Sequence, residues 1–175
     1  CFLVNGISLA ADSSNSEVIN GRPVATWFVG DNFFDSFALN HHGYLNVGYM
    51  YICLSNIAML YFTYRLKNLS IPKVLLRHVS ELWQLTKLCT FPDGRLCRIG
   101  GDTRIRYCYC QDYALPSWLM MYDICGDVSC KTFEENWFKI VKQEVDFNGN
   151  ASFLSARCSD LEKISPVYYT RLEAD

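Results

Sequence analysis

The sequence lacks a strong excess of charge of either sign and lacks any run of basic residues. Its 16 Lys and Arg against 18 Asp and Glu give a formal net charge of -2, and the basic residues are scattered along the chain. Proteins that bind nucleic acid gather cations into a patch or stripe. We therefore expect no nucleic-acid partner, although a local cluster of arginines could still hold another polyanion.

Cysteine is abundant but lacks the regular spacing of a disulfide framework. There are nine cysteines, an odd number, which fits reduced, buried thiols better than a secreted disulfide scaffold. The start of the chain has no initiator Met and no basic and apolar regions of a signal peptide. These absences predict a cytoplasmic location, with the periplasm or secretion as alternatives, and a chain that is a fragment of a longer protein.

Charge is absent from residues 44–64, a stretch rich in aromatic side chains. Its apolar positions go round every face of a helix, which predicts a helix that is buried on most sides. A membrane span also needs about 20 apolar residues. Asn46, Ser55, Asn56 and Thr63 are polar, however, and the tyrosines are not confined to the two ends. We therefore expect an inner helix of a helical domain and no membrane span.

The second predicted helix covers residues 70–88. Ser70 suits the N-cap position and Pro72 the first turn. Its two sides differ in polarity, which is typical of an amphipathic outer helix, and a short polar turn makes it the antiparallel neighbour of the first. The apolar side holds Val74, Leu75, Val79, Leu82, Trp83, Leu85 and Leu88, and the polar side holds Lys73, Arg77, Glu81, Gln84 and Lys87.

Three further helices complete the predicted fold. Residues 111–125 form a helix that Gly126 ends as a C-terminal glycine cap, residues 129–145 form an amphipathic helix, and Asp31 could cap a short helix over 31–38. The expected fold class is all-α, with antiparallel α/α hairpins that are part of an incomplete (α/α) toroid. The expected organisation is an irregular segment at 1–43, an α/α-hairpin domain at 44–146 and a C-terminal segment of undetermined structure at 147–175.

The candidate catalytic residues lie together before the first long helix. Asn40, His41, His42 and Tyr44 combine an amide, two imidazoles and a phenol within five positions. Imidazole and phenol groups are common general bases and acids. A structural role at a helix entrance is the competing interpretation of these histidines.

The candidate substrate-binding residues lie in a loop between the second and third helices and at the beginning of the third. Turn residues at 91–94 and 100–102 frame this loop. Its guanidinium and carboxylate groups are Arg95, Arg98, Asp102, Arg104, Arg106 and Asp112. If the helix pairs stack in register, this loop and the histidine cluster emerge at the same end. An ordinary solvated loop is the alternative.

We call the surface formed by this loop and the histidine cluster the rim. The rim would suit an acidic oligosaccharide or polysaccharide, because Arg pairs bidentately with carboxylate or sulfate groups. Elimination at a uronate needs a group that neutralises the carboxylate, a base for the C5 proton and an acid for the leaving oxygen. Asn or Arg, His and Tyr suit these three tasks. The enzymatic alternative is hydrolysis, with Asp102 and Asp112 as the acid pair.

Cysteines near this loop raise the question of a metal site. Cys97, Cys108 and Cys110 have no paired C-x2-C knuckles, and positions 108 and 110 would point two thiols apart in a helix. We therefore expect no metal and no cofactor.

Together, several short motifs resemble those of the heparinase II/III-like proteins and related uronate-processing families, over residues 31–146. They are the Asn-His-His-Gly-Tyr turn at 40–44, the Pro-Asp-Gly turn at 92–94, the Gly-Gly-Asp-x-Arg loop at 100–104 and Asp-Tyr-x-Leu at 112–115. The resemblance implies an (α/α) toroid, often followed by a β-sandwich, with an Asn/His/Tyr/Arg site that would include Asn40, His41 or His42, and Tyr44. The alternative function is a non-catalytic helical interaction or scaffold module. The oligomeric state is left open.

Overall fold

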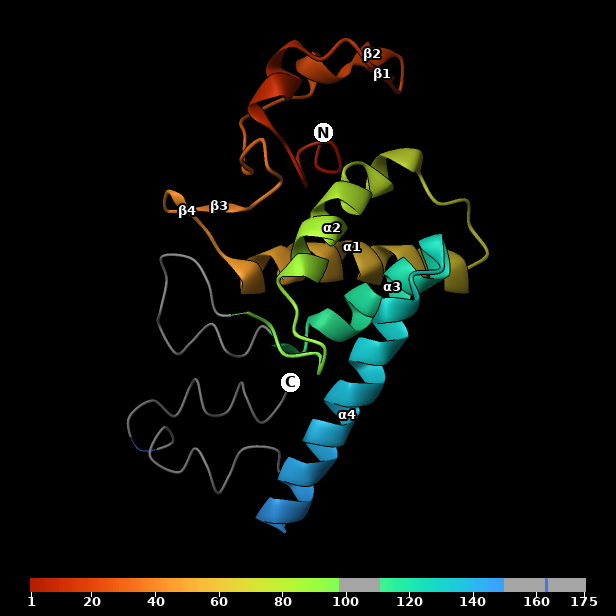
Figure 1. The fold of residues 1–175 in the computed structure, drawn as a ribbon. Coiled ribbons are helices and arrows are strands. Elements are labelled where there is room, and N and C mark those ends of the chain that lie inside the picture. The colour runs from red at the N-terminus through yellow and green to blue at the C-terminus, as the bar shows by residue number, and fades with distance from the viewer. Residues whose placement is uncertain (98–110, 150–162, 164–175) are drawn as a thin grey trace.

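The computed structural model describes residues 1–97, 111–149 and 163, and this part of the chain is mostly helical, with two small pairs of antiparallel strands (Figure 1). The strands are β1 (Val18–Ile19), β2 (Arg22–Pro23), β3 (Asn40–His41) and β4 (Tyr44–Leu45). The α-helices are α1 (Val47–Leu66), α2 (Val79–Leu88), α3 (Ala114–Cys125) and α4 (Val128–Asn148), and the 3-10 helices are η1 (Ala10–Ser14), η2 (Val24–Thr26) and η3 (Lys73–Leu76).

Helix α1 begins where Asn46 accepts a hydrogen bond from the backbone N–H of Tyr49 at 2.9 Å, the usual role of an N-cap side chain. Its fully buried residues follow one stripe: Val47, Met50, Tyr51, Leu54, Ser55, Ala58 and Tyr61. Met59 and Leu66 are 62% and 84% exposed. The prediction of a helix buried on most sides therefore holds for residues 47–55, none of which is exposed, and is wrong for the later turns, where exposed residues gather. None of the helices within residues 1–97 and 111–149 has both the length and the apolar character needed to cross a membrane.

Helix α2 is shorter than the predicted helix over 70–88. Pro72 precedes η3, and His78 has a φ of 62°, in the left-handed region, so that α2 begins only at Val79. The break accompanies a buried contact: Arg77, expected on the polar side, donates to the carboxylate of Asp12 at 3.0 Å. Leu88, expected on the apolar side, is 82% exposed at the end of α2. Both side assignments are wrong: the contact with Asp12 buries Arg77, and Leu88 is the last residue of α2.

The two later helices match the prediction closely. Helix α3 ends at Gly126, whose φ of 66° and N–H bond to the Tyr122 carbonyl at 2.9 Å are those of a glycine C-cap. Helix α4 covers the predicted range of 129–145 and extends a little beyond it at both ends. The short helix expected over 31–38 is wrong: Phe33 and Leu39 form an antiparallel bridge around a turn in this stretch.

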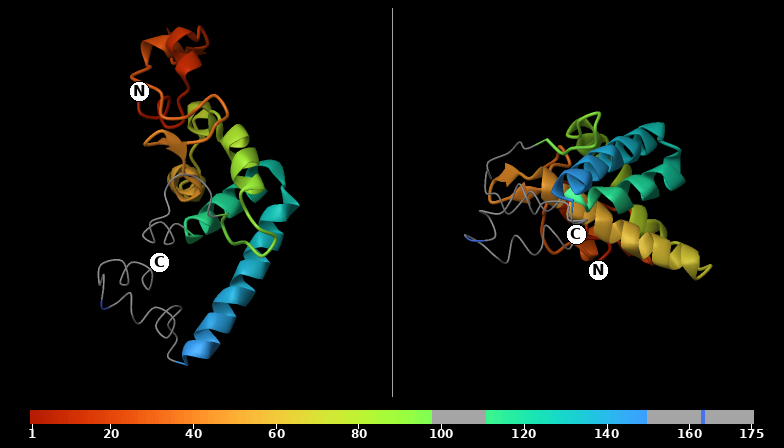
Figure 2. Two further views of the ribbon diagram at one scale, coloured as in Figure 1. Left: turned by 60° about the vertical axis from the view of Figure 1, so that its left-hand side comes forward. Right: turned by 90° about the horizontal axis from the view of Figure 1, so that it is seen from below.

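One hydrophobic core joins the four α-helices to the N-terminal segment. Helix α1 packs against α2 and α3, and α3 packs against α4. Tyr51 and Trp118, near the starts of α1 and α3, share a hydrogen bond of 3.2 Å, and Tyr61 and Asp123, further along each helix, share one of 2.6 Å. The order of these contacts shows that α1 and α3 run in the same direction, as Figures 1 and 2 also show. Both helices therefore begin on the same side of the fold.

Candidate functional site

The predicted catalytic residues form a tight β-hairpin at the entrance to α1. Asn40 pairs with Leu45 and His41 with Tyr44, and the two residues between the strands, His42 and Gly43, both have positive φ values of 57° and 88°. Two positive φ angles are what a type I′ hairpin turn requires. The Oδ1 atom of Asn40 accepts a hydrogen bond from the Gly43 N–H at 3.0 Å and holds this turn closed. The local sequence therefore brings the predicted residues together.

His41 lies at the centre of a small group of rings. The centroid of its imidazole is 4.2 Å from that of His42, 4.7 Å from that of Tyr49 and 6.2 Å from that of Tyr44. Tyr49 comes from the first turn of α1, which fixes its position against the hairpin. His41 and Tyr44 are half-buried, whereas Asn40 and His42 are exposed. The hairpin thus offers two imidazoles, a phenol and an amide beside one another at the surface, a set that can transfer protons.

The structure describes two of the predicted substrate-binding residues. The guanidinium of Arg95 is held by Asp93 at 2.8 Å, and its side chain is 61% exposed. Burial favours the neutral form of Asp93, but the hydrogen bonds from Arg95 outweigh this and lower the pKa of the carboxyl. Asp112 lies two residues before α3. The other four, Arg98, Asp102, Arg104 and Arg106, lie outside the described residues.

The expected turn at 91–94 is present, because the Gly94 N–H donates to the Phe91 carbonyl at 2.9 Å. Since α1 and α3 begin on the same side of the fold, the hairpin before α1 and Asp112 before α3 approach the core from that side. A rim shared by the histidines and the whole arginine loop stays a prediction, because most of its arginines lie outside the described part of the chain.

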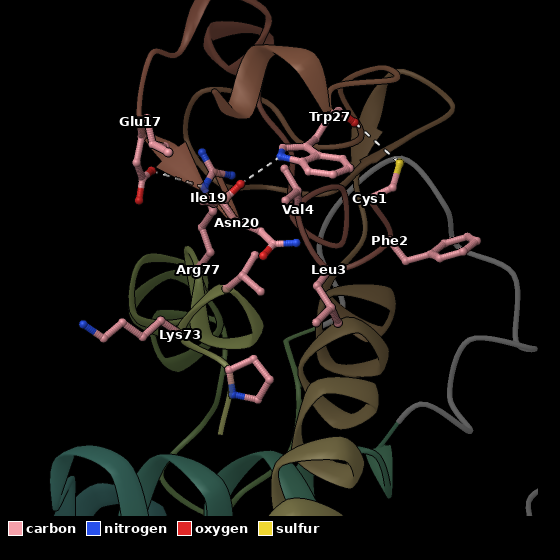
Figure 3. Close-up of a pocket in the computed structure, with 13 residues that line it drawn as sticks. Cys1, Phe2, Leu3, Val4, Glu17, Ile19, Asn20, Trp27, Lys73 and Arg77 are labelled. Carbon is pink, nitrogen blue, oxygen red and sulfur yellow. Dashed lines mark hydrogen bonds and ion pairs between the residues drawn. The ribbon is translucent and has the colours of Figure 1, made fainter. Parts of the chain in front are cut away.

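A cavity of about 760 Å³ lies away from this hairpin, beneath the N-terminal segment (Figure 3). Its walls combine apolar side chains such as Val4, Ile19 and Trp27 with the charged Lys73 and Arg77. The Nε1 atom of Trp27 donates to the Ile19 carbonyl at 3.2 Å and fixes the indole in the wall. None of the predicted site residues lines this cavity. Sequence reasoning missed it because its walls come from segments about 50 residues apart.

Within residues 1–97, 111–149 and 163, no group of His, Cys, Asp and Glu side chains is arranged to hold a metal ion. Cys89 and Cys97 are free thiols. Cys108 and Cys110, which prompted the question of a metal, lie outside the described residues. No known family, curated protein or solved structure matches this chain.

Proposed function

We propose that this chain is part of a carbohydrate-active enzyme that acts on acidic, uronate-containing polysaccharide, with β-elimination as the leading reaction. The observation that carries the proposal is the β3–β4 hairpin, in which the rings of His42 and Tyr44 lie 4.2 and 6.2 Å from that of His41. Proton transfer in such a reaction requires a base and an acid that lie within reach of one sugar ring. The hairpin supplies candidates for both on the surface.

In the proposed reaction, one imidazole of the hairpin removes the C5 proton of the uronate. The phenol of Tyr44 donates its proton to the glycosidic oxygen as the bond to C4 breaks, which leaves a C4–C5 double bond in one product. The Oδ1 atom of Asn40 accepts a hydrogen bond from the Gly43 N–H, so its side-chain N–H groups face the substrate in this proposal and neutralise the uronate carboxylate by hydrogen bonding. Stabilising this carboxylate matters because negative charge develops there as the proton leaves. Arg95 and the arginines of the 98–106 loop would bind flanking uronates.

The helical arrangement supports this proposal at the level of the fold. Helices α1 and α3 pack directly and run in the same direction, and each is followed in the chain by a second helix, α2 or α4. Repetition of this order is the pattern of stacked helix pairs. We propose that these pairs are antiparallel α/α hairpins and belong to a larger (α/α) toroid.

The proposal predicts that the full-length protein forms unsaturated uronates. Incubation with alginate or polygalacturonate should raise the ultraviolet absorbance, and a separate assay of reducing ends should rise in parallel. His41→Ala, His42→Ala and Tyr44→Phe test the hairpin, and loss of the true base or acid should lower kcat by about 10²- to 10⁴-fold. Tyr122→Phe is the matched control, since Tyr122 is a half-exposed phenol on α3, outside the hairpin, and should leave the rate unchanged.

Other outcomes would redirect the proposal. Reducing ends without ultraviolet absorbance would indicate hydrolysis, for which Asp102 and Asp112 are the candidate acid pair. Full turnover in a His41→Ala, His42→Ala double variant would remove both histidines from the mechanism. No product from any uronate polymer would contradict the enzymatic proposal.

The second candidate is a non-catalytic interaction module, and the cavity beneath the N-terminal segment favours it. The cavity of about 760 Å³ is of the size that binds small molecules or peptide side chains and holds none of the proposed catalytic residues. In this alternative the hairpin residues stabilise the entrance to α1 and perform no chemistry. Binding of a uronate oligosaccharide in calorimetry, without turnover and without an effect of the His41→Ala and His42→Ala changes, would support this second function.

A further inference from the structure

Two cysteines lie opposite each other across the turn that follows α2. Thr90 and Leu96 form an antiparallel bridge, and the Cys97 N–H donates to the Cys89 carbonyl at 2.7 Å. Cys89 is the C-cap residue of α2, with φ −93° and ψ 17°, and this backbone hydrogen bond at the edge of the bridge places it next to Cys97.

This backbone contact fits the geometric requirement for a disulfide. A disulfide joins residues whose Cα atoms are about 4.4 to 6.8 Å apart, and a direct hydrogen bond between the Cys97 N–H and the Cys89 carbonyl makes the two residues neighbours. Burial raises the pKa of the Cys89 thiol and the neighbouring Cys97 adds to this rise, as expected when the two sulfur atoms are close. The two thiols also differ in access, because Cys89 is buried and Cys97 is partly exposed.

We propose that Cys89 and Cys97 form a reversible disulfide under oxidising conditions and that this bond fastens the turn at residues 89–97. With glutathione disulfide as the oxidant, the more exposed Cys97 attacks first as its thiolate. A mixed disulfide forms and one glutathione leaves as its thiolate, which takes up a proton. Cys89 then attacks the Cys97 sulfur, its thiol proton is lost and the second glutathione leaves. Two protein thiols are oxidised and one glutathione disulfide is reduced to two glutathione thiols, so that atoms and electrons balance.

The turn at 89–97 is a junction of helices. The side chain of Gln111, just before α3, donates to the Gly94 carbonyl at 2.8 Å and accepts from the Leu96 N–H at 2.9 Å. Asn136 of α4 donates to the Pro92 carbonyl at 2.9 Å. A disulfide across the base of this turn would therefore hold the end of α2 against the start of α3 and the middle of α4. The inference is independent of the saccharide proposal, because it rests on the contact between the two cysteines.

The test is direct because a protease site lies between the two cysteines. Trypsin cleaves after Lys87, Arg95 and Arg98, so that a Cys89–Cys97 bond links peptide 88–95 to peptide 96–98. The native chain is treated with glutathione disulfide, its remaining thiols are alkylated in acid, and the digest is analysed by mass spectrometry. We expect this linked pair to be the main disulfide product, to disappear with dithiothreitol and to be absent from Cys89→Ser and Cys97→Ser. A Cys53→Ser variant should form it as the unaltered chain does.

The melting temperature of the native chain gives a second test that needs no serine variant. The oxidised chain should melt several degrees above the reduced chain, because the bond closes a loop in the unfolded state. A Cys108→Ser, Cys110→Ser, Cys158→Ser variant should still form the 88–95 to 96–98 link. Predominant linkage of Cys97 to Cys108, Cys110 or Cys158 in the native chain would overturn the proposal. A Cys89–Cys97 bond that forms no faster in the native chain than in urea would also overturn it, because the fold would not be bringing the thiols together.

Discussion

Gly94 closes the turn after α2 with a φ of 87°, and its Cα faces α4. A Cβ atom at this position would lie 2.7 Å from the Phe133 carbonyl oxygen, 2.9 Å from the Cβ of Trp137 and 3.2 Å from the ring of Trp118. The first of these atoms belongs to the backbone of α4 and the second is the Cβ of a buried side chain, so neither can move aside easily. The residue is therefore glycine for two physical reasons, its left-handed backbone and the close approach of α4.

Gly94→Ala is expected to lower the free energy of unfolding by about 3 kcal/mol, from the cost of a side chain at positive φ and the cost of overpacking. Urea denaturation followed by circular dichroism measures this change. Gly126→Ala is the matched control, because Gly126 also has a positive φ, 66°, but nothing lies within 4 Å of a Cβ placed there. That change should cost about 1 kcal/mol. Equal costs at the two positions would contradict the close approach of α4 to Gly94.

Among the secondary-structure elements, α2 and α4 are connected by the side chain of Asp127. This residue is the N-cap of α4, where it accepts from the Ser129 N–H at 3.1 Å. It also accepts from the Trp83 indole at 2.9 Å and from the Lys87 ammonium at 2.8 Å, both on α2. Burial favours the neutral acid, but the hydrogen bonds from Lys87, Ser129 and Trp83 outweigh this and lower the pKa of Asp127 strongly.

Asp127→Ala is expected to lower the free energy of unfolding by about 2 to 3 kcal/mol, through the lost cap and an indole N–H left without its acceptor. Because the pKa of Asp127 is lower in the folded state, its stabilisation is present above the unfolded pKa of about 3.9 and is lost as the pH falls below it. Unfolding free energies from pH 7 to pH 3 should therefore fall less steeply for Asp127→Asn than for the unaltered chain. Asp146→Asn, which removes an exposed pair with Lys142, should keep the original slope.

The elements that were predictable are those with local signals. Gly126 ends α3 as its sequence position indicates, and the apolar periodicity of 129–145 places α4 closely. The break before α2 was not predictable, because it accompanies a contact between Arg77 and Asp12, 65 positions apart in the chain. The β3–β4 hairpin was also missed. Its Gly43 suits a type I′ turn, but His42 stands where Asn or Asp is the usual signal.

For the candidate site, the sequence itself located the histidine cluster, whereas the rim shared with the arginines stays a prediction, because residues 98–110 lie outside the described part of the chain. The ring contacts of His41 with Tyr49 could not be predicted, since they depend on where the hairpin ends and α1 begins. The cavity beneath the N-terminal segment could not be predicted from the sequence for another reason. Its walls join Leu3, Trp27 and Lys73, and no periodic pattern links such distant positions.

At the scale of the whole molecule, the N-terminal segment is held to the helices by a buried ion pair. Both carboxylate oxygens of Asp12, in η1, contact the guanidinium of Arg77, which lies between η3 and α2. The side chains of Asp12 and Arg77 are 3% and 8% exposed. Burial favours the neutral form of Asp12, but the hydrogen bonds from Arg77 and Leu9 and the charge of Arg77 outweigh it and lower its pKa. This pair therefore depends on both partners being charged.

Asp12→Ala is expected to lower the free energy of unfolding by about 3 to 5 kcal/mol, because it leaves the buried Arg77 guanidinium with only the longer contact of 3.8 Å to the exposed Glu17. Asp12→Leu combined with Arg77→Met should recover most of this loss, since apolar residues can replace a buried ion pair at little cost. The exposed pair of Arg65 and Asp123 is the control, and Arg65→Ala should cost less than about 1 kcal/mol. Urea denaturation of the four chains gives these values. If Asp12→Ala cost no more than Arg65→Ala, the ion pair would not be what holds the N-terminal segment to the helices.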